Sequence, residues 1–135
     1  MSRPVGYWLK LVDGLLESGL DDELAHADLT RRAWQVLNVV RDGPVHEASV
    51  VAALQPFGVR AGAAELAELV AGGLVEQTAG GYVLSARGNS VRDDVSRRVT
   101  EFRTRVADGI SAEEYGTTLT TLERMARNLG WSPGA

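Results

Sequence analysis

Residues 44–80 constrain the fold of this chain more than any other part of the sequence. Two stretches, 46–54 and 60–71, carry apolar residues at helical spacing and are separated by Gln55-Pro56-Phe57-Gly58. Proline and glycine interrupt a helix, so the first of these helices ends there, and Gly72-Gly73 ends the second. The sequence therefore predicts two short helices joined by a tight turn.

A predicted hairpin follows these helices directly. Residues 74–78 and 82–85 are typical of short strands, and they flank Ala79-Gly80-Gly81, which favours a tight turn. Two helices joined by a turn and followed at once by a two-stranded hairpin form a winged helix-turn-helix. Such elements commonly bind DNA, so the pattern indicates a nucleic-acid partner.

The charge of the same stretch argues against that partner. Its one basic residue is Arg60, whereas Glu47, Glu65, Glu68 and Glu76 bring its formal charge to −3. Elements that bind DNA are normally basic because they neutralise phosphates. DNA affinity would therefore have to come from a few local basic side chains.

The residues before this stretch predict two further helices. Apolar residues recur every three or four positions across residues 7–16, which predicts a first helix that ends near Gly19 and is followed by an acidic connector, residues 21–28. Thr30 is a suitable N-cap for the second helix, which Asp42-Gly43-Pro44 ends. This second helix has too many apolar positions for a surface helix, so we expect it at the centre of the fold.

The residues after the hairpin predict two more helices, both with an apolar side. The first begins near Arg87 and carries six arginines against three acidic residues, which can bind phosphate or pair with acids four residues away. Ser111-Ala-Glu-Glu114 is a capping box that begins the second. The apolar stripes comprise Val91, Val95, Val99, Phe102 and Val106 in the first helix and Tyr115, Leu119, Leu122, Met125 or Ala126, and Leu129 in the second.

Composition excludes several classes of function. The 135 residues suit one globular domain, and the chain has no cysteine and only two histidines, His26 and His46, so we expect neither a metal site nor a cofactor. No phosphate-binding loop, dinucleotide fingerprint or Ser-His-Asp arrangement is present, so an enzyme is not expected. The N-terminal residues carry Lys10, Asp13 and Glu17, which argues against a signal peptide or membrane span and favours the cytoplasm.

Five short segments occur in an order and at a spacing typical of one protein family. They are Leu29-Thr30 with Trp34, Val36 and Leu37; Gly43-Pro44-Val45; Leu69 with Gly73-Leu74-Val75-Glu76; Leu84-Ser85-Ala86-Arg87-Gly88; and the tail from Ile110 through Leu122-Glu-Arg-Met125 to Leu129. In this order they resemble the multiple antibiotic resistance regulator (MarR) family of winged-helix transcription factors. The fourth segment is similar to the Leu-Thr-x-x-Gly opening of the family's long helix.

The resemblance implies a single MarR-like domain over residues 1–135, mainly α with a small β-hairpin wing. Its winged helix-turn-helix core would span residues 29–88, between dimerisation helices at 1–20 and 88–131. The partners implied are a second copy of the chain, a palindromic double-stranded DNA operator and a small aromatic effector. The candidate DNA-binding residues are Arg60, Ala63, Ala64, His46, Arg31, Arg32 and Arg87, and the candidate ligand-binding residues are Trp8, Val12, Trp34 and Tyr115.

The sequence departs from the family at the positions that would touch DNA. Arg60 is the one basic residue at the start of the second short helix, and His46 stands where the family often has Thr or Ser. The family's Asp-x-Arg segment between the strands is replaced by Gly80-Gly81, which removes an arginine for the minor groove. An alternative hypothesis is therefore a winged-helix dimer with weakened or lost DNA binding that serves as a ligand sensor or protein-interaction module.

Overall fold

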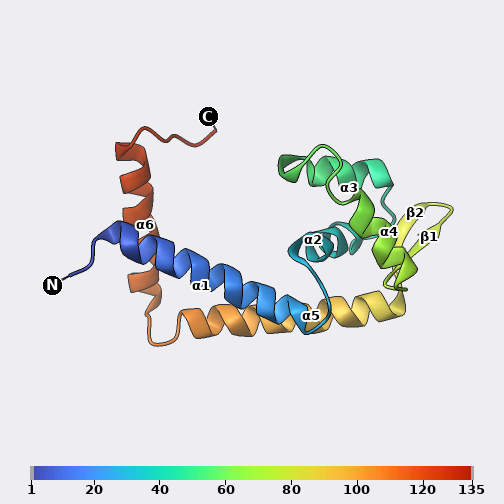
Figure 1. Ribbon diagram of the computed structural model, residues 1–135, viewed down its shortest axis with the longest axis horizontal. Helices are drawn as coiled ribbons and strands as arrows, with labels where there is room; N and C mark the ends of the chain where they lie inside the picture. The colour runs from blue at the N-terminus through green and yellow to red at the C-terminus, as the bar shows by residue number, and fades with distance from the viewer. Residues whose placement is uncertain (1, 135) are drawn as a thin grey trace. The chain divides into compact units, whose positions relative to one another are not determined.

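The computed structural model describes residues 2–134 and is mainly α-helical with one two-stranded hairpin, which confirms the predicted fold class (Figure 1). The chain divides into two compact units, the first ending at Phe102 and the second beginning at Arg103. The elements are α1 (Val5–Ala25), α2 (Arg31–Val40), α3 (Glu47–Ala53), the 3-10 turn η1 (Gln55–Phe57), α4 (Ala63–Ala71), β1 (Val75–Thr78), β2 (Gly81–Leu84), α5 (Ala86–Val106) and α6 (Ala112–Asn128).

Helix α2 lies at the centre of the first unit, as its many apolar residues predict. Val36, Leu37 and Val40 are completely buried, and the helix packs against α1, α3, α4 and β2. The Thr30 hydroxyl oxygen accepts a hydrogen bond of 3.1 Å from the Ala33 amide, which confirms the predicted N-cap. The fully buried residues that complete this core are Leu24, Val50, Leu66, Val75 and Val95.

Helix α1 is longer than the sequence predicts. It continues through Gly19 to Ala25, so the prediction of an end near Gly19 and an acidic connector after it is wrong. Leu20 and Leu24 extend the apolar stripe by further turns, and Leu24 is completely buried. Gly19 packs closely against α5: a Cβ there would lie 2.4 Å from the Phe102 ring, which would have to move. The chain turns at Asp28, whose φ of +56° lies in the left-handed region.

The second helix of the helix-turn-helix begins later than expected. The sequence places its start near Arg60, but α4 begins at Ala63, so Arg60 lies in the turn that precedes it. Gly62 sets this boundary with a φ of +93°, a conformation in which a side chain is strained. A Cβ at Gly62 would also lie 2.6 Å from Leu54 Cδ1, so the turn packs directly on the core.

The wing is a two-stranded antiparallel hairpin with Val75 opposite Leu84 and Thr78 opposite Gly81. This confirms the predicted tight hairpin, with strand boundaries that differ by one residue. Val45 pairs with the other edge of β2: its amide donates to the Tyr82 carbonyl at 3.0 Å, and the Tyr82 amide donates to the Val45 carbonyl at 2.7 Å. The residue that enters the helix-turn-helix is thus tied to the wing.

The junction between the wing and α5 explains the Leu84–Gly88 segment of the sequence. The Ser85 hydroxyl accepts from the Gly88 amide at 2.9 Å and donates to the Gly73 carbonyl at 2.6 Å, so it caps α5 and binds the turn after α4. A Cβ at Gly88 would lie 1.9 Å from the Leu74 carbonyl oxygen. Only glycine lets α5 begin this close to the wing.

The second unit contains the end of α5 and the whole of α6. The Ser111 hydroxyl accepts from the Glu114 amide at 3.0 Å, and the Glu114 carboxylate accepts from the Ser111 amide at 3.0 Å, which confirms the predicted capping box. The hydrogen bond from the Ser111 backbone amide, and secondarily the Ser111 side chain, lower the pKa of the Glu114 carboxyl below its ordinary value. The exposed apolar residues of this unit are Val106, Ile110, Tyr115, Leu119, Met125, Leu129 and Trp131.

We expect Gly88→Ala to lower the free energy of unfolding by about 2 kcal/mol, because the new methyl group collides with backbone rather than with a movable side chain. Urea denaturation at a fixed protein concentration measures the change. Gly6→Ala is the matched control, since no atom lies within 4 Å of its Cβ, and its effect should stay within about 0.5 kcal/mol. Equal effects of the two substitutions would contradict the packing described for Gly88.

The Glu114 carboxyl should titrate below the ordinary glutamate pKa when followed by NMR, and Ser111→Ala should move that pKa back up. Because the folded-state pKa is lowered, the ionised cap stabilises α6 above the unfolded-state pKa, and this stabilisation is lost as the pH falls through the folded-state pKa. Ser90→Ala, which removes an exposed hydroxyl from α5, serves as the control. The backbone hydrogen bond remains in Ser111→Ala, so an unchanged Glu114 pKa in that variant would refute the contribution of the Ser111 side chain.

Candidate nucleic-acid interface

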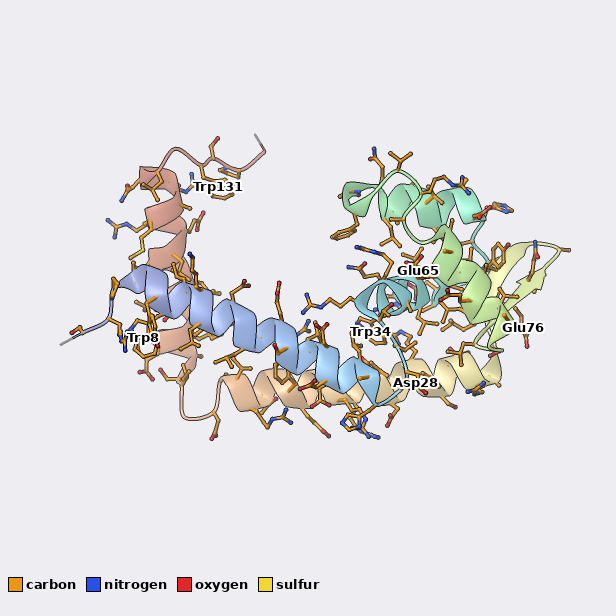
Figure 2. All side chains as sticks on the ribbon, viewed as in Figure 1. Trp8, Asp28, Trp34, Glu65, Glu76 and Trp131 are labelled. Carbon is orange, nitrogen blue, oxygen red and sulfur yellow. The ribbon has the colours of Figure 1, made fainter. Side chains whose placement is uncertain are left out.

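The exposed side of α4 is the surface that a winged helix would present to DNA. Leu66 and Leu69 face the core, whereas Ala64, Ala67, Glu68 and Ala71 are exposed. This side of the helix is therefore smooth and apolar except for one carboxylate. Glu65 lies half-buried on the same helix, and Glu76 is exposed on β1 (Figure 2).

Arg60 is the basic side chain nearest to the start of α4 in the sequence. Its side chain is 70% exposed, and its Nη2 lies 3.7 Å from Glu47 Oε1 at the start of α3. A contact this exposed and this long holds the guanidinium only weakly, so Arg60 remains accessible to a phosphate. His46 is the exposed N-cap residue of α3, and its side chain makes no capping hydrogen bond.

Arg31 connects two helices. Its Nε donates to Asp21 Oδ1 at 2.8 Å and its Nη2 donates to the Glu17 carbonyl at 2.8 Å, so it ties the start of α2 to α1. Arg32 bonds Gln35 Oε1 at 2.8 Å and lies 4.4 Å from the centre of the Phe57 ring. Both arginines therefore have intramolecular partners, and their contact with DNA stays a prediction.

Arg87 also has a structural partner. Its Nη1 donates to the Gly72 carbonyl at 2.8 Å, where it satisfies an acceptor at the C-terminal end of α4. A guanidinium has five N–H donors, and the Arg87 side chain is otherwise exposed, so donors remain for a phosphate. The structure thus places Arg87 at the base of the wing, the position that the sequence predicts.

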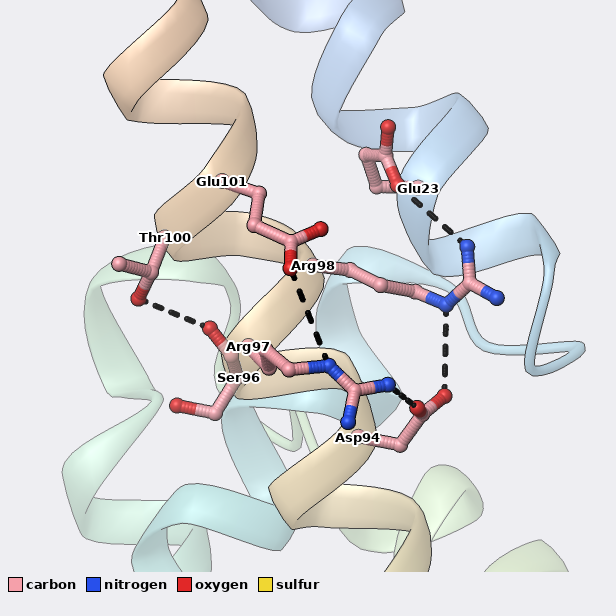
Figure 3. A network of polar contacts seen from close by, with 7 residues as sticks. All are labelled: Glu23, Asp94, Ser96, Arg97, Arg98, Thr100 and Glu101. Carbon is pink, nitrogen blue, oxygen red and sulfur yellow. Dashed lines mark hydrogen bonds and ion pairs between the residues drawn. The ribbon is translucent and has the colours of Figure 1, made fainter.

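The arginines farther along α5 pair largely with acidic neighbours (Figure 3). Arg97 and Arg98 both bond the Asp94 carboxylate, and Arg97 Nε also lies 3.9 Å from Glu101 Oε1. Arg98 Nη1 lies 3.9 Å from Glu23 Oε2, which links α5 to α1. These pairs at helical spacing use much of the positive charge of α5 inside the chain.

Three of the four candidate ligand-binding residues, Trp8, Val12 and Trp34, belong to the first unit. Trp8 and Val12 are exposed on α1, Trp34 is half-buried on α2, and Trp8 near the start of α1 lies well away from Trp34 (Figure 2). Tyr115 belongs to the second unit and is exposed on α6. Their role as a ligand site stays a prediction.

A hollow of about 230 Å³ lies instead beside α4, which the sequence did not indicate. Connector residues 27–30, Glu65, Glu68, Leu69 and Arg87 are among those that line it. It is smaller than a typical ligand pocket of roughly 300–1,000 Å³. Within residues 2–134 no three His, Cys, Asp or Glu side chains gather as a metal site would require, and no helix has the length and apolar character to cross a membrane.

Helices α1 and α6 each leave an apolar surface in contact with solvent. On α1, Trp8 is 52% exposed and Leu15 is 62% exposed, and the Tyr7 ring packs edge-on against Trp8 at 5.2 Å. On α6, Leu119 is 52% exposed. Contiguous apolar surface of this kind marks an interaction site in a soluble protein.

Comparison with known proteins supports the fold. No protein-family model matches the sequence, and none of the curated proteins matches it. Among solved structures, the chain is similar to the reduced form of MarR from E. coli, with 20% identity, a TM-score of 0.68, and 93% of this chain and 95% of that chain covered. A putative MarR family transcriptional regulator from Clostridium acetobutylicum gives 15% identity, a TM-score of 0.76, and 94% and 99% coverage.

A third similar structure contains a ligand. It is a MarR family protein from Mycobacterium tuberculosis in complex with p-aminosalicylic acid, with 22% identity, a TM-score of 0.65, and coverage of 92% of this chain and 99% of that chain. The chain therefore has the winged-helix fold of MarR family transcriptional regulators, which confirms the predicted resemblance at the level of fold.

We expect Arg31→Ala to lower the free energy of unfolding by up to about 1 kcal/mol, because it removes a partly exposed link between α1 and α2. Thermal or urea denaturation measures this loss. Arg41→Ala is the control, since Arg41 pairs with its sequence neighbour Asp42 and joins no separate elements. A larger loss in Arg41→Ala than in Arg31→Ala would count against the link.

Proposed function

We propose that this protein is a homodimeric, DNA-binding transcriptional regulator of the MarR type that acts in the cytoplasm and has no catalytic role. The observation that carries the proposal is a winged helix-turn-helix in a chain whose N-terminal and C-terminal helices leave their apolar sides exposed. A second copy would cover those sides, and a pair of winged helices would then face one duplex. The similarity to solved MarR family regulators supports this assignment.

The dimer follows from the cost of exposed apolar surface. Burial of apolar side chains contributes about 25 cal/mol per Å², so a helix such as α1, with several half-exposed leucines and the half-exposed Trp8, gains substantially from a partner. A twofold interface buries the same surface on both copies. The exposed apolar sides of α1 and α6 can each be buried in this way. Twofold symmetry in turn implies a palindromic operator.

DNA affinity would rest on few basic side chains. Arg60 is the accessible one before α4, and Arg87 retains donors at the base of the wing, while Arg31 and Arg32 are partly committed to other contacts. His46, Ala63 and Ala64 complete the proposed DNA surface at the starts of α3 and α4. With so few phosphate contacts for each subunit, binding should be weak at physiological salt and much stronger at low salt.

A small aromatic effector is the third part of the proposal. The complex of a similar protein with p-aminosalicylic acid supports this class of ligand. We propose Trp8, Val12, Trp34 and Tyr115 as the residues that bind it; Trp8, Val12 and Tyr115 are exposed in the single chain, where a partner copy can cover them. Effector binding would then couple to the dimer and to the position of the winged helices.

A second candidate function is favoured by the negative charge around α4. Glu68 and Glu76 are exposed and Glu65 is half-buried, while the arginines nearby have intramolecular partners. A dimer with lost DNA binding that docks a basic protein partner would make use of this surface. A titration with DNA separates the two functions.

Fluorescence anisotropy with the upstream region of the protein's own gene should show specific binding at low salt that weakens as salt is added, with a slope set by the few phosphate contacts of each subunit. The comparison is a random duplex of the same length and base composition. Equal affinity for both duplexes would eliminate the first function and favour the second.

Arg60→Ala should weaken operator binding and flatten the plot of log affinity against log salt by about 1.8 units, because a dimer would lose two phosphate contacts worth about 0.9 each. Its free energy of unfolding should hardly change, since the side chain is 70% exposed. Lys10→Ala, which removes one positive charge from α1, serves as the control. An unaltered salt slope in Arg60→Ala would remove Arg60 from the interface.

A further inference from the structure

We infer that Glu68 is a specificity-determining residue that selects cytosine in the major groove. The inference rests on the proposed DNA-binding function and goes beyond it by naming the base that α4 recognises. It starts from the side chains that the exposed side of α4 offers to a groove.

Glu68 is the charged residue on that exposed side. The other exposed positions of α4 are Ala64, Ala67 and Ala71, whose methyl groups cannot donate or accept a hydrogen bond. Glu65 is half-buried, and Arg60 lies before the helix begins. If α4 distinguishes bases by hydrogen bonds from its exposed side, Glu68 is therefore the side chain that makes them.

The carboxylate of Glu68 is also available. No ion pair or side-chain hydrogen bond engages it within residues 2–134, whereas Glu47, the other exposed acid of the two short helices, lies 3.7 Å from Arg60. Its backbone carbonyl accepts from the Gly72 amide at 2.8 Å, which holds the last turn of α4. The helix thus holds the Glu68 backbone in place, while its carboxylate can accept hydrogen bonds from a partner.

An ionised carboxylate can only accept hydrogen bonds. In the major groove guanine presents two acceptors, N7 and O6, and thymine presents the acceptor O4, so both repel a carboxylate. Adenine offers its N6 amino group but places the acceptor N7 beside it. Cytosine presents its N4 amino group alone, so cytosine N4–H donating to Glu68 is the favoured contact.

Ala64 can contact a second base next to the cytosine. Ala64 lies one helical turn before Glu68 on the same exposed side, and a small apolar side chain suits the C5-methyl group of thymine. Arg60, just ahead of α4, would contact a phosphate and so set the register of the helix without selecting sequence. The half-site expected from this surface contains a cytosine with a thymine close by.

Selection of operators from a random duplex library at low salt tests the inference, with the wild-type protein, Glu68→Gln and Asp22→Asn. We expect wild-type dimers to enrich cytosine at one position of each half-site. In Glu68→Gln the preference at that position should change from cytosine to adenine, because a glutamine amide bonds adenine N6 and N7 together. Each variant removes one negative charge, and Asp22 is an exposed residue of α1, so Asp22→Asn should keep the wild-type preference.

Competition binding with the selected operator measures the size of the effect. Replacing the cytosine should weaken wild-type binding roughly fivefold or more, and replacing the nearby thymine by uracil, which removes only the methyl group, should weaken it less. Thermal unfolding of Glu68→Gln should match the wild type because the side chain is exposed.

The outcomes separate the inference from the function on which it rests. If wild-type protein enriches no sequence and binds all duplexes equally, both the DNA-binding function and the role of Glu68 are overturned. If wild-type protein enriches a palindrome but Glu68→Gln keeps the same preference, or only binds every duplex more tightly as Asp22→Asn does, the function stands and the role of Glu68 is overturned.

Discussion

The burial of α2 is the interaction on which the first unit depends. Val36, Leu37 and Val40 are completely buried, and burial of each such side chain contributes about 1.5–3 kcal/mol. Four elements pack on this helix: α1, α3, α4 and β2. A substitution that disturbs the buried side of α2 would therefore alter the packing of both the helix-turn-helix and the wing. The arginine that opens α2, Arg31, extends this connection to α1 through Asp21.

Several basic side chains near the candidate interface already have partners within the chain. Arg87 satisfies the carbonyl of Gly72, and Arg97 and Arg98 pair with Asp94, so most basic side chains already stabilise the fold. Within the described residues, the exposed side of α4 offers a partner alanine methyl groups and the Glu68 carboxylate, with Arg60 accessible just before the helix and Arg87 keeping some donors at the base of the wing. A DNA-binding protein built in this way would gain little from phosphates and would depend on base contacts and on the doubling of each contact in a dimer.

The sequence predicted the order of the helices, the hairpin and both caps, because these follow from local patterns of apolar residues and hydrogen-bonding side chains. The end of α1 and the start of α4 differ from the sequence prediction. Gly19 lies inside α1 against the Phe102 ring, a contact distant in sequence, and Gly62 adopts a φ of +93° that sets the start of α4; neither is visible in the local pattern of apolar residues. The partners of Arg31 and Arg87 also lie far away in the sequence. The sequence therefore predicts where these arginines lie, but not whether their guanidinium groups are free to bind a phosphate.

The apolar sides of α1 and α6 need a second chain to cover them, since the single chain leaves Leu15 62% and Leu119 52% exposed. Light scattering coupled to size-exclusion chromatography measures this most directly. We predict a mass of twice the 14.5 kDa of the chain at micromolar concentration, and a shift toward 14.5 kDa when Leu15 is replaced by glutamate. A wild-type protein that elutes at 14.5 kDa throughout the concentration range would contradict the dimer and, with it, the proposed recognition of a palindromic operator.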